Sequence, residues 1–525
     1  MSLLLLSAGP PVCLSAQVID TVVIVNRNVF DLEADGAAPG FLARLANALH
    51  VRTHSWVIRR ALLVNPGDPY DSARVAESER ALRGLFVFSQ VRLDTVRIRG
   101  RLALRVETTD GWSTKPQLGY SSAGGAVSWL AGVVEENLLG TATSLTAVYN
   151  KTPDRSVFDL GYLNPHFIGR RARLQGEYAD KSDGKRGVWF VGVPFYETAA
   201  RAALATDGEA ASEQVLVFRD SALYTTVERR ALRLGVTAGF APHATSRDYV
   251  RLWLGGQWRR EDFREAADTT STAFPRSVFG TVGGGVDAGH VRFQVLERFN
   301  SYARREDVDV SQLLHVGLWA APRAWGYPAG QAGVGPELSW QVGARWSSGF
   351  AVLRGAANGV YGADGLDSGR VAGSLTVASQ NLPRQTLLAH FEGRALRRPN
   401  PGSEFDLWLL QRGPRVFGIH QLTGTRMVWV VVEDRVLLSD ELWGLVGLGV
   451  APFLDYGGAW YAEGFRDLAI PSERPRFGGD VGLSLRFGPT HAVRGDVGEI
   501  AVGYRFGQGF AGSRWGLSIR KGLAF

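Results

Sequence analysis

The chain has one cysteine among its 525 residues, and it contains no run of about 18 apolar residues. One cysteine excludes a disulfide framework and a zinc site built on cysteine. The lack of a long apolar run excludes a helix that spans a membrane. Lysine is also scarce, with 5 residues, so arginine supplies most of the 58 basic side chains and the net charge of +7. The arginines are spread among acidic residues instead of clustering in a run, so we expect no nucleic-acid partner.

Glycine and aromatic residues are abundant. The chain has 64 Gly, and aromatic residues make up 10% of it. With 45% hydrophobic residues it is too apolar for a disordered chain, and the composition favours many strands joined by tight turns. No nucleophile elbow, zinc-protease motif or phosphate loop occurs, and Gly283-Gly284-Gly285 lies in a strand-like segment. We therefore expect neither an enzyme nor a cofactor.

Residues 1–16 read MSLLLLSAGPPVCLSA and resemble a truncated secretory signal peptide. Leu3 to Leu6 form a short apolar core, and Ser15-Ala16 is a small-residue pair at which cleavage could occur. No Lys or Arg precedes the apolar core. Removal of this segment would also remove Cys13, so we expect an exported protein without cysteine.

Residues 17–113 predict a small α+β domain. The expected order is one strand, two helices and two strands: Val18–Val25, Pro39–His50, Ser72–Arg83, Phe88–Thr95 and Leu102–Thr108. Asp71 follows a Gly67-Asp68-Pro69 turn and is placed to cap the second helix. His50 and His54 stand four apart, as metal ligands on a helix do, but no third ligand is evident and we expect no metal.

Residues 114–525 show recurring segments of alternating apolar and polar residues separated by Gly, Pro, Asp, Asn or Ser. In Gly498–Phe506, for example, Ile500, Val502 and Tyr504 oppose Glu499, Gly503 and Arg505. A soluble β-sandwich would also alternate, but apolar-out and polar-in strands of about ten residues are typical of transmembrane barrels. Closure also removes the exposed edges of so large a sheet.

Several passages resemble the BamA- and TamA-type outer-membrane assembly superfamily, also called the bacterial surface antigen family. WVIRRALLVNPGDPYDSARVAESERALRGLFVFSQVRL, followed by VETTDGW, resembles a POTRA domain. GYSSAGGAVSWLAGVVEENLLG, LTAVYN and FDLGYLNPHF resemble the first four barrel strands, and Glu306-Asp307-Val308 the opening of a middle strand. LQRGPRVFGIHQLTGTRMVWVVVEDRVLL carries the most informative match. The chain ends on Phe525, as barrels recognised for assembly often end on an aromatic residue.

The resemblance implies a loop near 398–424 that folds into the lumen. In that loop Arg415, Phe417 and Gly418 occupy the positions of the family's Arg, aromatic and Gly, and Val416 replaces the Gly that normally follows the Arg. The family pairs this Arg with acids that map to Glu433 and Asp455. Strand parity agrees, because each acid alternates with apolar residues that would face lipid. Ordinary scattered lumen charges are the alternative interpretation.

The resemblance also implies a barrel of 16 strands, five of them after the loop. More than the expected eleven segments precede the loop. We interpret some of those in 196–230 and 277–300 as halves of long strands or as hairpins that extend outside the membrane, with 18 strands as the alternative count. The first and last strands should meet at a lateral seam. Its expected residues are Pro116, Leu118, Tyr120, Trp515, Leu517 and Phe525.

The resulting hypothesis is an assembly or translocation factor of the bacterial outer membrane with its N-terminal domain in the periplasm. Its expected partners are the outer-membrane bilayer, unfolded outer-membrane or secreted client proteins, and periplasmic chaperones or assembly lipoproteins. The main alternative is a passive, anion-favouring porin or a surface-exposed binding barrel. Export of one dedicated partner is a third reading. A steady open conductance would favour the porin, and a mostly closed, flickering one the assembly factor.

Overall fold

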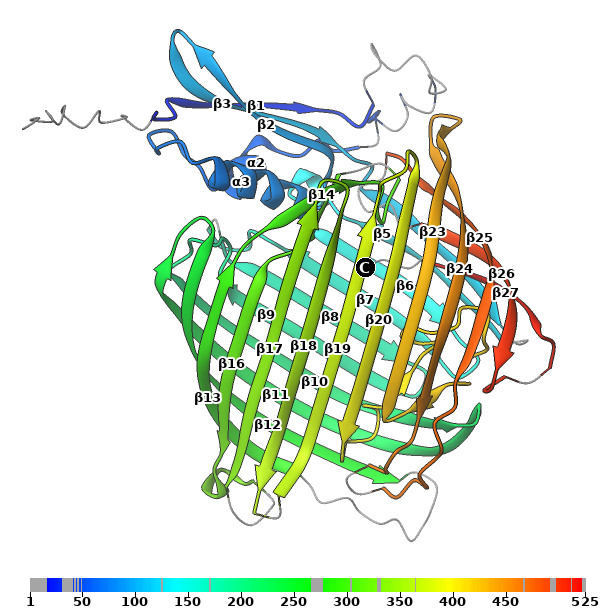
Figure 1. Ribbon diagram of the computed structural model, residues 1–525. Coiled ribbons are helices and arrows are strands. Elements are labelled where there is room, and N and C mark those ends of the chain that lie inside the picture. The colour runs from blue at the N-terminus through cyan, green and yellow to red at the C-terminus, as the bar shows by residue number, and fades with distance from the viewer. Residues whose placement is uncertain are drawn as a thin grey trace, which may run out of the picture.

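The computed structural model describes residues 17–30, 50–123, 126–169, 171–265, 277–302, 305–327, 332–363, 365–465, 468–491, 497–510 and 512–521, with scattered positions between 41 and 48. A small N-terminal domain lies across one end of a large β-barrel (Figure 1). We call the covered end the near end and the opposite one the far end. The predicted signal peptide and Phe525 lie outside the described residues.

The N-terminal domain is a mixed three-stranded sheet with helices on one face. Its strand order is β1 (Thr21–Arg27), β3 (Arg101–Asp110), β2 (Phe88–Ile98), with β1 parallel and β2 antiparallel to β3. The helices are α2 (Ser55–Ala61) and α3 (Ser72–Gly84). The core is fully buried at Ile19, Ile58, Leu82 and Leu104. Asp71 caps α3 as predicted, because its side chain accepts from the backbone N–H of Ala73 and of Arg74.

The POTRA-like prediction does not match the structure. The helix expected at Pro39–His50 is described only at scattered positions. The helix that precedes α3 is α2, which was not predicted as one. It has seven residues and buries only Val57, Ile58 and Ala61. So short a helix shows less than two full periods, and hydrophobic spacing therefore gives it no clear signal.

The remainder of the chain forms one closed antiparallel barrel. Twenty strands belong to it among the described residues. Their bounds are β4 (Thr114–Ala123), β5 (Ala126–Glu135), β6 (Ser144–Lys151), β7 (Ser156–Asn164), β8 (Arg173–Lys181), β9 (Gly184–Val193), β10 (Ala202–Arg219), β11 (Ala222–Ala244), β12 (Asp248–Glu265), β13 (Ser277–His290), β16 (Gln312–Ala321), β17 (Gly333–Trp346), β18 (Gly349–Gly362), β19 (Gly365–Ser379), β20 (Gln385–Arg397), β23 (Arg426–Leu442), β24 (Val446–Trp460), β25 (Gly478–Pro489), β26 (Gly498–Gly507) and β27 (Trp515–Lys521). Short 3-10 turns stand at Leu138–Gly140 and Arg323–Trp325.

The predicted count of 16 strands is wrong, and the error lies before the inward loop. Five strands follow that loop, as predicted, but fifteen precede it. β10, β11 and β13 occupy the two zones interpreted as halves of long strands. Each of them pairs with a neighbour on both sides. A strand that is hydrogen-bonded to a different strand on each side is a separate strand of the barrel, so these segments are not halves of one strand.

Alternation along the strands separates an outer apolar face from a lumen. On β16, Leu314, Val316 and Leu318 are exposed on the outside, while His315 and Trp319 share the inner face with Glu337 of β17. An outward apolar band of this kind is the pattern of a membrane-spanning barrel. Among the described helices, none is long and apolar enough to cross a membrane.

Two short strand pairs are separate from the barrel sheet. β14 (Phe293–Glu297) and β15 (Arg305–Asp309) pair as a hairpin at the near end, between β13 and β16. Glu306-Asp307-Val308 therefore belongs to this hairpin. The sequence resemblance had implied that these residues open a barrel strand, and that prediction is wrong. Within the inward loop, β21 (Phe405–Asp406) pairs with β22 (Thr423–Gly424).

Candidate functional site

The loop between β20 and β23 is anchored inside the lumen. Its own two-strand pairing brings Phe405 and Asp406 beside Thr423 and Gly424. Residues from the loop pack with the inner faces of β20, β23 and β24 in one buried cluster: Leu396, Phe405, Leu407, Phe417, Leu422, Met427, Trp429, Val431 and Ala459. The loop near 398–424 is thus an ordered part of the interior, as the family resemblance implied.

Arg415 is the centre of the site, which we call the latch. Its Nε and Nη2 donate to the two carboxylate oxygens of Asp455 on β24, at 2.6 and 2.9 Å. Nη2 also lies 2.6 Å from Oε1 of Glu433 on β23. All three side chains are fully buried. A bidentate, charge-assisted pair of this kind fixes both the position and the orientation of the guanidinium, and both predicted acid partners are where the parity argument placed them.

A third acid, Glu499 on β26, completes the latch. Arg415 Nη1 donates to its Oε1 at 2.9 Å. The guanidinium carbon also lies 3.9 Å from the ring centre of Phe453, a cation–π contact. Glu499 was not predicted as a partner. Its parity, opposite Ile500 and Val502, already placed it in the lumen, but no sequence signal tied it to Arg415.

The backbone next to Arg415 is held as firmly as its side chain. Val416 N–H donates to Asp480 Oδ2 at 2.7 Å, and its carbonyl accepts from Arg505 Nε at 2.7 Å. Val416 is fully buried. A Cβ at Gly516 would lie 2.9 Å from Val416 Cβ, and one at Gly503 would lie 3.3 Å from Val416 Cγ2. Glycines on β26 and β27 therefore leave the room that the valine, standing in place of the family's glycine, requires.

Phe417 and Gly418 continue the latch segment toward the far end. The ring of Phe417 is buried and meets Phe510 edge to face, with ring centres 5.5 Å apart. A Cβ at Gly478 would lie 2.5 Å from the Phe417 ring, so that glycine is needed for the close approach. Gly418 N–H donates to Gln421 Oε1 at 2.8 Å, which closes a local turn.

The far part of the same loop is tied to the opposite wall by His420. Its Nε2 lies 2.8 Å from Asp154 in the β6–β7 turn, and its Nδ1 contacts Asp406. The ring stacks on Phe218 of β10 with ring centres 3.5 Å apart. Burial opposes a charge on this ring, but hydrogen bonding and attraction by the two carboxylates raise the pKa of His420. None of these contacts was predicted.

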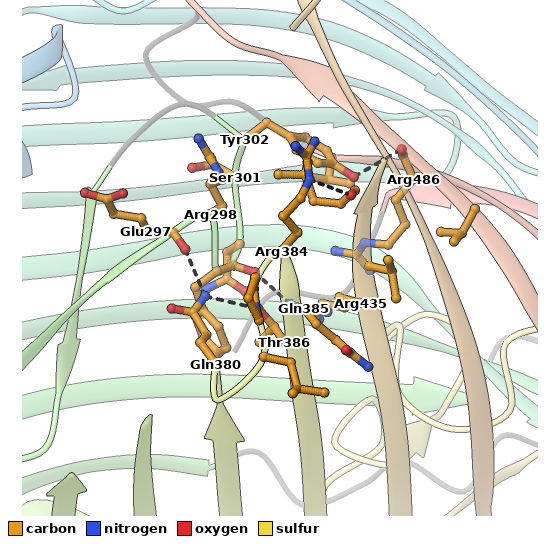
Figure 2. A pocket seen from close by; sticks show the side chains of 18 residues that line it. Glu297, Arg298, Ser301, Tyr302, Gln380, Arg384, Gln385, Thr386, Arg435 and Arg486 are labelled. Atoms are coloured by element: carbon orange, nitrogen blue, oxygen red, sulfur yellow. Dashed lines mark hydrogen bonds between the residues drawn. The ribbon is translucent and has the colours of Figure 1, made fainter. Parts of the chain in front are cut away.

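At the near end, the hairpin β14–β15 closes the lumen from the other side. Phe299 in its tip is buried against Phe350, with ring centres 5.4 Å apart. Figure 2 shows the tip residues Arg298, Ser301 and Tyr302 facing Arg384, Arg435 and Arg486 across a small cavity. Tyr302 donates to the Arg486 carbonyl at 3.1 Å.

Arg435 links this hairpin to the latch. Its Nη1 donates to the Phe299 carbonyl at 2.8 Å, and its Nε donates to Glu433 Oε2 at 2.8 Å. Glu433 in turn contacts Arg415. On the domain side, Arg83 of α3 donates from Nε and Nη2 to the two Asp307 oxygens, both at 2.7 Å. A continuous series of polar contacts therefore runs from the N-terminal domain through the hairpin to the latch.

The predicted seam residues lie on adjacent strands. The closed strand order places β27 beside β4. Leu118 and Tyr120 of β4, and Trp515 and Leu517 of β27, are all exposed on the outer face. Pro116 lies in β4, and its parity with Leu118 places it on that face. On the inner face Arg520 of β27 pairs in register with Glu499, and its Nε lies 3.7 Å from Glu499 Oε1.

His50 and His54 have separate hydrogen-bond partners. His50 Nε2 lies 2.8 Å from Asp110 Oδ2, while His54 donates its backbone N–H to the Gly140 carbonyl. The described residues contain no group of three His, Cys, Asp or Glu side chains placed to hold a metal.

No family model and no curated protein matches the chain. Solved structures of large barrels resemble it. CdiB from Escherichia coli is 10% identical, with 98% of this chain and 92% of that one covered and a TM-score of 0.45. CdiB from Acinetobacter baumannii is 10% identical, with 96% and 74% covered and a TM-score of 0.43. BamA from Haemophilus ducreyi lacking POTRA domains 1–3 is 11% identical, with 95% and 83% covered and a TM-score of 0.38.

Proposed function

We propose that the chain is an outer-membrane barrel that inserts or translocates client proteins through the β4–β27 seam, with the near end and its N-terminal domain in the periplasm. The observation that carries this proposal is the fully buried Arg415, held by acids from β23, β24 and β26. Of these strands, β26 pairs directly with the seam strand β27, and β24 and β23 follow beyond β25 in the same wall. A wall braced in this way can keep its shape while the seam beside it parts.

Strand addition is the mechanism that the seam supports. Parting β4 from β27 would expose one row of backbone donors and acceptors on each strand, and such edges template a further strand. A client segment would pair there while its apolar side chains face the lipid. Periplasmic chaperones or assembly lipoproteins would be the proteins that deliver such clients.

A passive pore that favours anions is the second candidate. A lumen cavity of about 550 Å³ is lined in part by Arg354, Arg370 and Arg394. Against a wide pore stand the inward loop and the near-end hairpin, each of which fills part of the lumen. Planar-bilayer recording separates the two: a steady open conductance supports the pore, and a mostly closed one supports the assembly factor.

The decisive experiment is reconstitution in liposomes with an unfolded barrel client. We expect the client to fold faster than in empty liposomes, Arg415→Ala to slow it, and Arg354→Ala, which removes a lumen arginine outside the latch, to leave it unchanged. A disulfide that joins β4 to β27 should also stop the acceleration. Client folding no faster than in empty liposomes would contradict the proposal, and full activity with the disulfide in place would contradict the seam mechanism.

A further inference from the structure

Helix α2 lies along the rim of the barrel and is tied to it at both ends. Before the helix, His54 N–H donates to the Gly140 carbonyl at 2.9 Å, and Asn137 Nδ2 donates to Thr53 Oγ1 at 2.9 Å. After it, Arg171 Nη2 donates to the Leu62 carbonyl at 3.2 Å. These anchors belong to the β5–β6 and β7–β8 turns. The helix axis therefore follows the rim of the barrel over these strands.

The two faces of α2 differ sharply. Val57, Ile58 and Ala61 are buried in the domain. The opposite face carries Trp56, which is 40% exposed, and Arg60, whose guanidinium carbon lies 4.4 Å from the Trp56 ring centre. Because Val57, Ile58 and Ala61 pack in the domain core, Trp56 and Arg60 lie on the face of α2 that the core leaves uncovered.

The rim beside this face is apolar. Leu139 in the β5–β6 turn and Ile168 in the β7–β8 turn are each 68% exposed. The strands that enter these turns present Val133 and Leu160 on the outer face of the barrel. Exposed apolar side chains therefore occur both on the outer wall and in the two turns on which α2 rests.

The charge of the α2 face has one sign. Arg52, Arg59 and Arg60 are its basic residues, with Arg52 and Arg59 exposed. Of the nearby acids that the structure describes, Asp110 and Glu136 are buried, Glu136 pairs with Lys115 at 3.0 Å, and half-buried Glu135 accepts from the Asn137 N–H. Tryptophan beside arginine, at the edge of an apolar wall, is the composition that a bilayer interface favours.

We propose that the α2 face, consisting of Arg52, Trp56, Arg59 and Arg60, binds the anionic phospholipid headgroups of the bilayer leaflet at the near end. The ring of Trp56 enters the interfacial layer beside Leu139 and Ile168, and the arginines pair with lipid phosphates. This inference rests on the proposed membrane position of the barrel and is independent of any client. It makes the bilayer a direct support of the N-terminal domain.

Hydrogen exchange of the full-length protein in nanodiscs tests the proposal. Backbone exchange in residues 50–62 should be slower in phosphatidylcholine mixed with phosphatidylglycerol than in phosphatidylcholine alone, by about fivefold per engaged arginine. Raising the salt concentration should reduce the difference, because exposed charges are screened. Exchange in α3, measured in the same samples, reports whether the domain remains folded.

Two variants make the test specific. Arg59→Gln with Arg60→Gln should remove most of the difference between the two lipid compositions. Arg97→Gln with Arg101→Gln removes the same charge at the turn between β2 and β3, away from the rim contacts, and should leave it intact. Equal exchange in both lipids for the unaltered protein, or an equal effect of both double variants, would overturn the proposal. Neither result depends on client folding, so failure here is distinguishable from failure of the proposed function.

Discussion

Asp455 and Asp480 are direct cross-strand neighbours on β24 and β25. Like charges in this arrangement normally destabilise a sheet. Here both carboxylates are buried, and the loop supplies donors to each: the Arg415 guanidinium to Asp455 and the Val416 N–H to Asp480. The strands therefore form a site of negative charge that is satisfied only when the loop is in the lumen.

Arg415→Ala should release the loop. Removing one partner from a buried ionic set costs on the order of 3–5 kcal/mol, because Asp455 would remain buried without its hydrogen-bonded cation, whereas Glu433 would keep Arg435. We expect faster protease cleavage within 398–424 and a lower midpoint of thermal unfolding. Arg415→Lys should restore only part of the lost stability, since an ammonium cannot make the bidentate pair with Asp455. Cleavage unchanged from the unaltered protein would show that the apolar cluster alone holds the loop.

Val416 and Gly516 should behave as a complementary pair. A Cβ at position 516 would approach Arg505 Nη2 to 2.7 Å and Val416 Cβ to 2.9 Å, closer than side chains normally pack. Gly516→Ala is therefore expected to destabilise the barrel by about 1–3 kcal/mol through overpacking. Adding Val416→Gly should recover the part of that loss due to the valine contact, and the part due to Arg505 should remain, although Val416→Gly alone also destabilises. Thermal unfolding of the four proteins gives the coupling energy, and strictly additive effects would contradict the packing argument.

At the scale of the element, the inward loop has an anchor that depends on pH. His420 faces a carboxylate at each ring nitrogen, Asp154 and Asp406. Only the doubly protonated ring can donate to both. Its pKa is raised in the folded protein, so its stabilisation of the loop is complete below the ordinary value of about 6.5 and is lost as the pH rises through the folded pKa. Half-buried Glu404 acts in the same direction, since burial raises its pKa to about 7 and favours its neutral form.

Protease cleavage of the loop should therefore accelerate as the pH rises from about 6.5 upward, because His420 loses its proton above its ordinary pKa. His420→Gln should cleave fast at every pH in this range and remove most of the dependence. Glu404→Gln is the matched comparison and should keep the part due to His420. If the cleavage rate of both variants still changed with pH as much as that of the unaltered protein, the pH dependence would belong to other groups. The Arg415 contacts should be insensitive over this range and provide the baseline.

The features of these elements that depend on alternation could be predicted from the sequence. Parity on β23 and β24 placed Glu433 and Asp455 in the lumen, and the number of strands after the loop was predicted correctly as five. Contacts between distant segments gave no comparable signal. Nothing local to Asp154 or Phe218 indicates that His420, more than 200 residues further along the chain, lies against them. The strand count failed for the related reason that alternation marks a strand but not its two neighbours.

At the scale of the whole molecule, two separate segments fill part of the barrel lumen and come together inside it. The latch loop enters from the far end, and the β14–β15 hairpin enters from the near end. Arg435 touches both, through Glu433 and the Phe299 carbonyl. Since Arg83 of the N-terminal domain holds the hairpin through Asp307, a movement of the domain would be transmitted to the acids that bind Arg415. The domain is therefore placed to control the lumen as well as to cover its mouth.

The Arg83–Asp307 pair provides the test of this coupling. Arg83→Ala removes two charge-assisted hydrogen bonds to Asp307, between side chains that are each 14% exposed, a loss of about 2 kcal/mol, and it also removes the contact of Arg83 with Glu79 within α3. We expect the hairpin to loosen, the conductance in planar bilayers to rise, and cleavage within 398–424 to accelerate although the loop itself is unaltered. Arg83→Asp combined with Asp307→Arg should restore both readings, whereas either reversal alone should be worse than Arg83→Ala. Arg92→Ala, which breaks an exposed pair with Asp94 on β2, is the control. If hairpin release left loop cleavage unchanged while conductance rose, the two closures would be independent, and the domain would control only the near end.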